Sequence, residues 1–157
     1  MKMKLFNLMT LSFLFITIAA CSGNSTVITR TSTSLPPGPP DLVEVDYFYE
    51  SDACFCLGLA SEWIDTTINN DYKNQLDSGK LTYVRYDTKD SANANVMAEF
   101  NATNYGFFIT VTKGNICSTY SVGGLWLYTD TTGENEMLKS KFIGLLTQEL
   151  DKALAGE

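Results

Sequence analysis

The chain is 157 residues long, carries 18 acidic against 11 basic side chains, and has a formal net charge of −7. That length suits one folded domain. The acidic balance argues against nucleic acid or an anionic membrane face as a partner held by charge. The sequence contains no histidine. This removes the commonest general base, the usual zinc ligand and the Ser-His and Cys-His catalytic pairs.

The N-terminal segment, residues 1–20, has the pattern of a secretory signal. Lys2 and Lys4 form a positive start, residues 5–18 are mostly apolar but short for a bilayer span, and two alanines precede Cys21. A cysteine at this point makes the segment resemble a bacterial lipoprotein signal. The resemblance implies that Cys21 begins the mature chain and carries acyl chains such as palmitate, which hold it on a lipid bilayer. We therefore expect an extracytoplasmic protein of the cell envelope, lipid-anchored through Cys21.

Residues 21–40 are rich in serine and threonine and end in a stretch that holds all four prolines of the chain. They offer few apolar side chains to bury, so we expect a disordered tether that becomes extended toward its proline end. Loss of the leader removes two lysines and no acid, which brings the net charge to about −9 and strengthens the case against nucleic acid. We expect the folded domain over residues 41–157.

The remaining chain alternates between strand-like and helix-like apolar periodicity. In chain order we expect a strand over 43–49, a helix over 57–76, a strand over 81–87, a helix over 91–101, strands over 107–112 and 116–122, a short apolar segment over 125–128 and a helix over 134–154. The strand over 81–87 is mostly apolar and aromatic, which predicts burial on both faces. Asp90 or Ser91 should cap the second helix, which should bury Val96, Met97 and Phe100.

This order of elements predicts an α/β fold with a mixed four-stranded sheet. The first two strands are separated by a helix, so they should be parallel and joined by a right-handed crossover. The strands over 107–112 and 116–122 are joined by a short turn and should form an antiparallel hairpin. A parallel β-α-β unit followed by a hairpin, with helices on both faces of the sheet, is the plan of the thioredoxin fold.

Short stretches at 45–48, 54–56, 78–83 and 105–106, and the segment around Trp126, occur in this order within residues 43–154. Together they resemble thioredoxin-like proteins, and more closely a group of exported or lipoprotein members related to the ArsF-type nitrophenyl compound nitroreductase subunit. The resemblance implies the thioredoxin-like fold and directs attention to the cysteines that begin the first helix. It implies the fold more firmly than an activity, because one fold can serve many functions.

The cysteine motif departs from the Cys-x-x-Cys of thioredoxin-like redox proteins, because Leu57 stands where the second cysteine would fall. Residues two apart share a side only in an extended chain, where their Cα atoms lie near the upper limit of about 6.8 Å for a disulfide. A Cys54–Cys56 bond should therefore be strained and easily reduced. The cis-proline that usually precedes the third strand is also absent, so a trans peptide is expected before Gly106.

The first functional hypothesis is a thiol–disulfide oxidoreductase with a degenerate Cys-x-Cys redox-active centre. Cys54 would be the nucleophile, favoured as a thiolate by the helix N-terminus, and Cys56 would resolve the mixed disulfide with a protein thiol client. Glu50 and Asp52 would oppose thiolate formation, and no basic residue lies close in sequence to offset them. A fixed structural disulfide, or a pair of inert thiols, is the alternative reading of these two cysteines.

The second hypothesis is a non-catalytic binding or scaffold module for a membrane partner. Residues 125–128 could form its docking patch, although such an apolar run is more often core beneath a helix. Capture of Cu(I) by Cys54 and Cys56 is a weaker option, because no histidine or nearby methionine completes a ligand shell; we predict no metal site and no cofactor. Cys117 should be a buried, apolar-like residue or an intermolecular contact.

Overall fold

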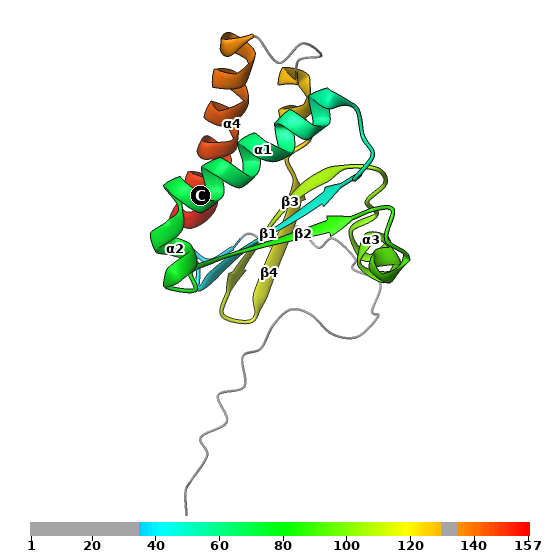
Figure 1. The fold of residues 1–157 in the computed structure, drawn as a ribbon. Helices are drawn as coiled ribbons and strands as arrows, with labels where there is room; N and C mark the ends of the chain where they lie inside the picture. Colours follow the sequence, from blue (N-terminus) through cyan, green and yellow to red (C-terminus); the bar gives the residue numbers. More distant parts are fainter. Residues whose placement is uncertain (1–34, 130–134) are drawn as a thin grey trace, which may run out of the picture.

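The computed structural model describes residues 35–129 and 135–157. The expected signal, Cys21 and the first part of the expected tether lie outside these described residues. Figure 1 shows the elements in order: β1 (Leu42–Tyr49), α1 (Phe55–Asp71), α2 (Lys73–Asp77), β2 (Leu81–Asp87), the 3-10 turn η1 (Ser91–Asn93), α3 (Ala94–Phe100), β3 (Gly106–Lys113), β4 (Ile116–Ser121), the 3-10 turn η2 (Gly123–Tyr128) and α4 (Glu136–Ala155). Among the described helices, none combines the length and the apolar content needed to cross a bilayer.

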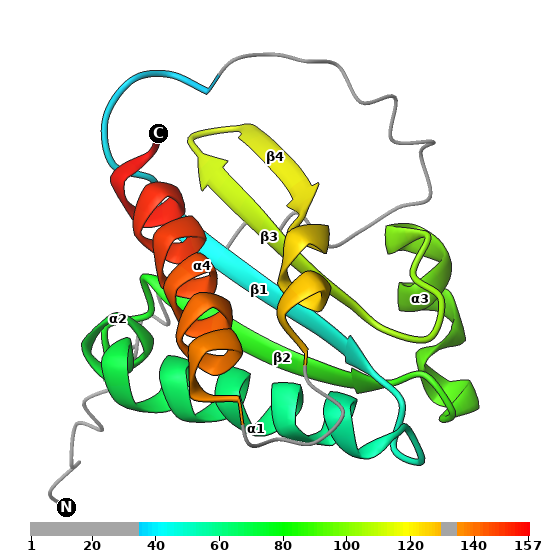
Figure 2. The ribbon, with the colours of Figure 1, turned by 90° about the horizontal axis from the view of Figure 1, so that it is seen from above.

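The four strands form one mixed sheet in the order β2-β1-β3-β4 (Figure 2). β1 runs parallel to β2, with Val43 opposite Leu81, and antiparallel to β3, with Phe48 opposite Gly106. β3 and β4 form the antiparallel hairpin that the sequence predicts. The expected α/β fold is confirmed, and its topology is thioredoxin-like.

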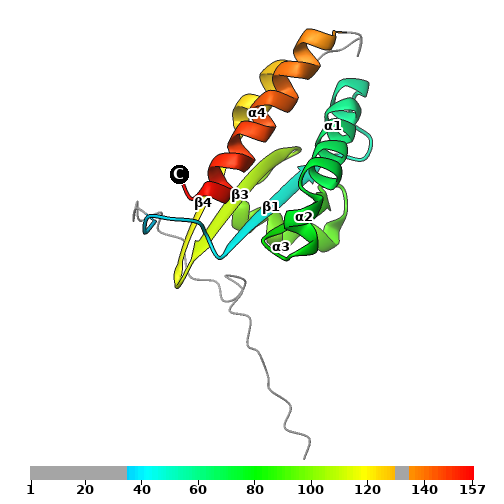
Figure 3. The same ribbon diagram turned by 90° about the vertical axis from the view of Figure 1, so that its left-hand side faces the viewer.

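The helices lie on both faces of the sheet, with α1 and α4 on one side and α3 on the other (Figure 3). Alternate residues of β1 point toward α1 and α4, and Val43, Val45 and Tyr47 are buried there. They belong to the main core, which Ile64 of α1 and Phe142 of α4 join. Apolar burial of this kind contributes about 25 cal/mol per Å², so the face that packs against α1 and α4 supplies most of the stability.

The opposite face holds a smaller aromatic cluster. Phe48 of β1 is fully buried against the rings of Tyr86, Phe100 and Phe108, at centroid distances of 5.1, 5.4 and 5.6 Å. Phe100 comes from α3, so this short helix is attached to the sheet through its last residue. Val96 and Met97 of α3 are only partly buried, as is Phe100 itself, so the burial expected for all three is incomplete.

Two expectations about the elements are wrong in detail. β2 is an edge strand, with Leu81 buried but Val84 43% exposed, so it is not buried on both faces.

The long helix expected over 57–76 breaks at Tyr72, which separates α1 from α2. The Tyr72 ring is buried and its hydroxyl donates to Thr147 O (3.1 Å) and to Asp151 Oδ1 (2.9 Å) of α4. The helix expected over 91–101 is divided into η1 and α3, and the expected cap at Asp90 begins η1, because Asp90 Oδ1 accepts from Ala92 N at 2.9 Å.

Residues 35–41, which we call the strap, lie against the start of the domain instead of extending freely. Lys113 Nζ donates to Pro36 O (3.0 Å), Pro37 O and Gly38 O (2.7 Å). Asp41 donates its backbone N–H to Thr112 O (2.9 Å), and its carboxylate accepts from Gly114 N (2.6 Å). Residues 36–38, near the end of the expected tether, thus contact the hairpin of β3 and β4, because Lys113 donates hydrogen bonds to their carbonyl groups.

Asp46 lies beside the aromatic cluster on the α3 face of β1. Burial raises the pKa of its carboxyl group from 3.8 to about 6, although a hydrogen bond from the Tyr86 hydroxyl opposes the rise. The nearby charges of Glu44 and Glu99 raise this pKa further. The folded protein therefore binds a proton at Asp46 more tightly than the unfolded chain does. Its contribution favours folding at low pH and is lost as the pH rises toward 6.

Asp46→Asn should remove this pH dependence. At pH 7 and above the variant should be more stable than the parent by about 1–2 kcal/mol, because no buried charge has to be desolvated. Urea unfolding measured from pH 4 to pH 8 would test this. Asp71→Asn, which removes the same charge from an exposed position at the end of α1, should leave the profile of the parent unchanged. Superimposable profiles for the parent and Asp46→Asn would contradict the expectation.

Candidate active site

The cysteine pair lies where the chain leaves β1 and enters α1. β1 ends at Tyr49, a turn closed by a hydrogen bond from Ala53 N to Glu50 O (3.1 Å) follows, and Cys54 is the N-cap residue of α1. The carbonyl oxygen of Cys54 accepts from Leu57 N at 3.0 Å and from Gly58 N at 3.2 Å, which starts the helix. The parallel pairing of β1 with β2 fixes this position, because α1 must begin at the carboxyl end of β1 to bring the chain back to the start of β2.

Cys54 and Cys56 are joined by a disulfide. Their Cα atoms are 5.4 Å apart, which is closer than the extended arrangement expected from the spacing. The difference arises because only Cys54 has an extended backbone (φ −59°, ψ 158°), whereas Cys56 is already within α1. Cys54 is exposed and Cys56 is partly buried. An attacking group from solvent therefore has better access to Cys54.

Exposed apolar side chains occur on three segments toward the carboxyl end of β1. Phe55, between the two cysteines, is 65% exposed, Tyr105 is 43% exposed and Leu127 is 77% exposed. Tyr105 directly precedes Gly106, which pairs with Phe48 at the carboxyl end of β1. Described peptide bonds are all trans, as expected before Gly106 in the absence of proline. These side chains offer apolar contacts to a polypeptide beside the disulfide.

The sequence left open whether residues 125–128 form a docking patch or part of the core, and the structure shows some of each. Leu125 is fully buried, and the Trp126 ring packs edge-on against Tyr105 (5.0 Å) and Phe142 (6.4 Å) and stacks on Tyr47 (6.3 Å). Only Leu127 is turned out into solvent. Core packing therefore accounts for most of this segment, and Leu127 alone adds to the exposed apolar surface.

Lys89 is the residue of this region that the sequence analysis missed. Its Nζ forms ion pairs with Glu50 and, at 3.6 Å, with Asp52, the two acids that precede the cysteines. The hydrogen bond to Glu50 is the main cause of a raised pKa at Lys89, and the charge of Asp52 adds to it. Lys89 lies in the loop after β2, far in sequence from the cysteines, so no local sequence pattern predicts its position beside Glu50 and Asp52. The parallel pairing of Tyr49 with Asp87 is what brings the two loops together.

Cys117 lies far from the pair. It sits on β4 opposite Thr112, and Thr112 in turn pairs with Leu42 at the start of β1, whereas the disulfide follows the end of that strand. Cys117 is exposed, so its interpretation as a buried residue is wrong. Its Sγ is 3.4 Å from Thr112 Oγ1. The structure thus brings together two of the predicted cysteines and places the third at the opposite end of the sheet.

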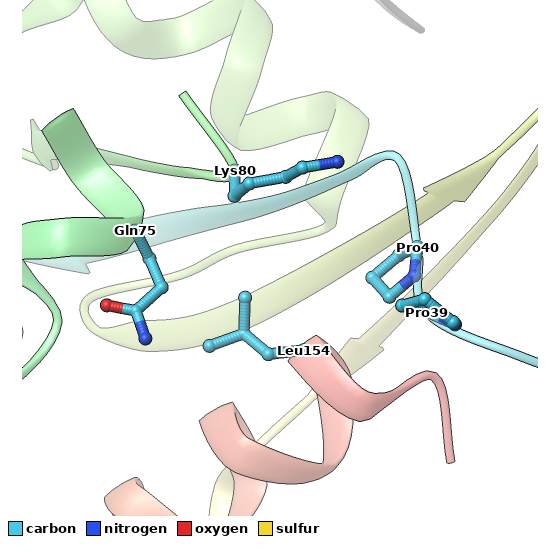
Figure 4. Close-up of a pocket in the computed structure, with 5 residues that line it drawn as sticks. All are labelled: Pro39, Pro40, Gln75, Lys80 and Leu154. Atoms are coloured by element: carbon cyan, nitrogen blue, oxygen red, sulfur yellow. The ribbon is translucent and has the colours of Figure 1, made fainter. Parts of the chain in front are cut away.

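A pocket of about 370 Å³ also lies away from the cysteines (Figure 4). It is bounded by Pro39 and Pro40 of the strap, Gln75 of α2, Lys80 and Leu154 of α4. The Gln75 Oε1 atom is buried and has no hydrogen-bond partner among the described residues. Lys80 is the only titratable residue of this lining, so no second group is present to act with it, and we assign the candidate site to the disulfide.

Comparisons with known proteins assign this chain to no family. No family model matches the sequence, and no curated protein matches it. Within the described part of the chain, no three cysteine or carboxylate side chains converge as metal ligands would. The chemistry of the site must therefore be argued from the disulfide, the start of α1 and the charged loop beside them.

The disulfide can be tested directly by peptide mapping. Trypsin should release residues 31–73 as one peptide that contains Cys54 and Cys56 and no other cysteine. In protein isolated without reductant, this peptide should resist alkylation and should be two hydrogens lighter than after reduction. Cys54→Ser should make Cys56 accessible to alkylation at once. Alkylation of both cysteines before reduction would contradict the structure.

Proposed function

We propose that this protein is a membrane-anchored, extracytoplasmic thiol–disulfide oxidoreductase whose redox centre is the Cys54–Cys56 pair. The observation that supports the proposal most is a disulfide between an exposed and a partly buried cysteine at the first turn of α1 in a thioredoxin-like fold. A helix N-terminus stabilises a thiolate there, because its partial positive charge and unpaired N–H groups favour an anion. Membership of the ArsF-type group, which the sequence resembles, is part of the same proposal.

In the proposed reaction the oxidised pair accepts two electrons from a client dithiol. A client thiolate attacks Cys54 Sγ, the more accessible sulfur, and forms a client–Cys54 disulfide while the Cys54–Cys56 bond breaks and Cys56 leaves as a thiolate. The second client thiolate then attacks the client sulfur of that mixed disulfide and releases Cys54 as a thiolate. The client gains a disulfide, and Cys54 and Cys56 take up the two protons that the client thiols lost.

The reverse reaction uses the same groups. In the reduced protein, Cys54 is the nucleophile toward a client disulfide, and Cys56 resolves the mixed disulfide by attacking Cys54 Sγ. The roles follow from position, since Cys54 caps the helix and is exposed, while Cys56 is partly covered. Exposed Phe55 and Tyr105 beside the pair would hold an apolar stretch of a client polypeptide.

The anchor belongs to the proposal as well. Acylation of Cys21 would hold the protein on a bilayer, and the intervening residues would let the domain reach clients outside the cytoplasm. The strap meets the domain at the start of β1, at the end of the sheet remote from the disulfide. Anchoring through the N-terminal segment would therefore leave the cysteine pair open to soluble or membrane-bound clients.

A non-catalytic binding module is the second candidate, and the exposed side chains of Phe55 and Leu127 favour it. In that case the same end of the domain would dock on a membrane partner, and the disulfide would only brace the first turn of α1. The two candidates differ in whether Cys54 must react. An experiment that removes one sulfur at a time separates them.

Cys56→Ser should trap a mixed disulfide between Cys54 and a client that bears a disulfide, because the resolving sulfur is missing. Non-reducing electrophoresis followed by mass spectrometry of extracts from cells that express the variant would show it. Cys54→Ser should trap far less, and its rate of exchange with a model disulfide peptide should fall by roughly 100-fold.

The double variant Cys54→Ser/Cys56→Ser is the matched control, since it keeps Cys117 and every surface contact. Adducts that persist in this control come from another site and do not count. Equal exchange rates in the parent and in Cys54→Ser, with no adduct in Cys56→Ser, would reject the redox function and leave the binding module.

A further inference from the structure

The loop that precedes the cysteines is held by the loop that follows β2. Asp87 Oδ1 accepts from Lys89 N at 3.0 Å and from Ser51 N at 3.4 Å, and Thr88 N donates to Tyr49 O at 2.8 Å. Thr88 Oγ1 also donates to Asn104 O at 3.2 Å, in the segment before β3. These contacts fix the backbone from which the Lys89 side chain reaches Glu50 and Asp52. Figure 2 shows the end of β2 beside the loop between β1 and α1.

We propose that Lys89 is a positioning residue of the Cys54–Cys56 centre, which acts by holding Glu50 and Asp52 in ion pairs and so offsets their charge next to the sulfurs. This inference rests on the proposed redox function of the pair. The geometry supports it because Lys89 contacts both acids at once. The side chain of Glu50 is only 19% exposed, so solvent screens that pair less than a fully exposed one.

The direction of the effect follows from charge. The disulfide is neutral, whereas the reduced pair gains negative charge when a thiol ionises. Uncompensated carboxylates of Glu50 and Asp52 would disfavour that thiolate, and Lys89 counters them. Lys89 therefore stabilises the reduced state relative to the oxidised state and makes the disulfide easier to reduce.

The test is the equilibrium of the full chain with reduced and oxidised glutathione, in which two glutathione thiols reduce the disulfide and become one glutathione disulfide. The redox state of Cys54 and Cys56 is followed by alkylation and mass spectrometry of the tryptic peptide that contains them. Lys89→Met should lower the equilibrium constant for reduction by about threefold to tenfold at low salt, and the difference should shrink in 1 M salt at a Debye length of about 3 Å. Lys89→Arg should retain the constant of the parent.

Lys73→Met is the matched control, because Lys73 is also exposed and pairs with one acid, Asp77, on α2. It should leave the constant unchanged. Adding Glu50→Gln and Asp52→Asn to Lys89→Met should restore the constant of the parent, since the charges that Lys89 offsets are then gone. A purely mechanical role of Lys89 predicts no such restoration.

An unchanged constant in Lys89→Met, or the same decrease in Lys73→Met, would overturn the inference. So would a decrease that salt and the added Gln and Asn substitutions leave in place. The glutathione equilibrium needs no client, so a shift in Lys89→Met together with an absence of trapped clients would reject the proposed function and still support the role of Lys89.

Discussion

The parallel pairing of β1 with β2 is the constraint on which the rest of the structure depends. Parallel neighbours cannot be joined by a tight turn, so the chain has to cross the sheet in a helix between them. The helix has to carry the chain back to the start of the parallel strand, so the first turn of α1 lies at the carboxyl end of β1. The location of the disulfide is therefore a consequence of the strand pairing. Only five residues, 50–54, connect β1 to α1, and the last of them, Cys54, is the helix cap.

The same pairing explains the charge environment of the site. Residues that follow parallel strands meet at one edge of a sheet, so the loop after β2 lies beside the loop after β1. Lys89 and the acids Glu50 and Asp52 meet there although almost forty residues separate them in the chain. On the other side of the site, Gly106 pairs with Phe48 and brings Tyr105 to the same edge. The loop after β1, the loop after β2 and the segment before β3 thus meet at the end of the sheet from which the disulfide-bearing turn leaves.

The sequence predicted what depends on local periodicity and element order. The strand at β1, the hairpin and the cysteines at the start of α1 all follow from patterns within a few residues. What it missed depends on contacts between distant segments. Tyr72 interrupts a continuous helical pattern because its hydroxyl bonds to α4, and Val84 is exposed because no strand lies beyond β2.

The same distinction between local patterns and contacts of distant segments applies to the candidate site. Cys54 and Cys56 could be named from spacing alone, but their separation could not, because it depends on where the helix begins. Lys89 gave no signal, since an isolated lysine after a strand is ordinarily a solvated side chain. The sequence analysis predicted a buried Cys117 or an intermolecular contact. On the edge strand β4, successive side chains alternate between partly buried and exposed positions, and Cys117 occupies an exposed one.

The strap has a mechanical consequence. A pull on the chain ahead of residue 35 is borne first by Lys113 and its carbonyl partners, and then by Asp41 and the hairpin tip at Gly114. From there the load enters β1, a central strand with hydrogen bonds to β2 on one side and to β3 on the other, and both sets must break before β1 can slide. The turn that bears the disulfide lies past the far end of that strand. The hydrogen bonds of the sheet therefore resist tension applied through the N-terminal segment before that tension reaches the loop that holds the cysteines.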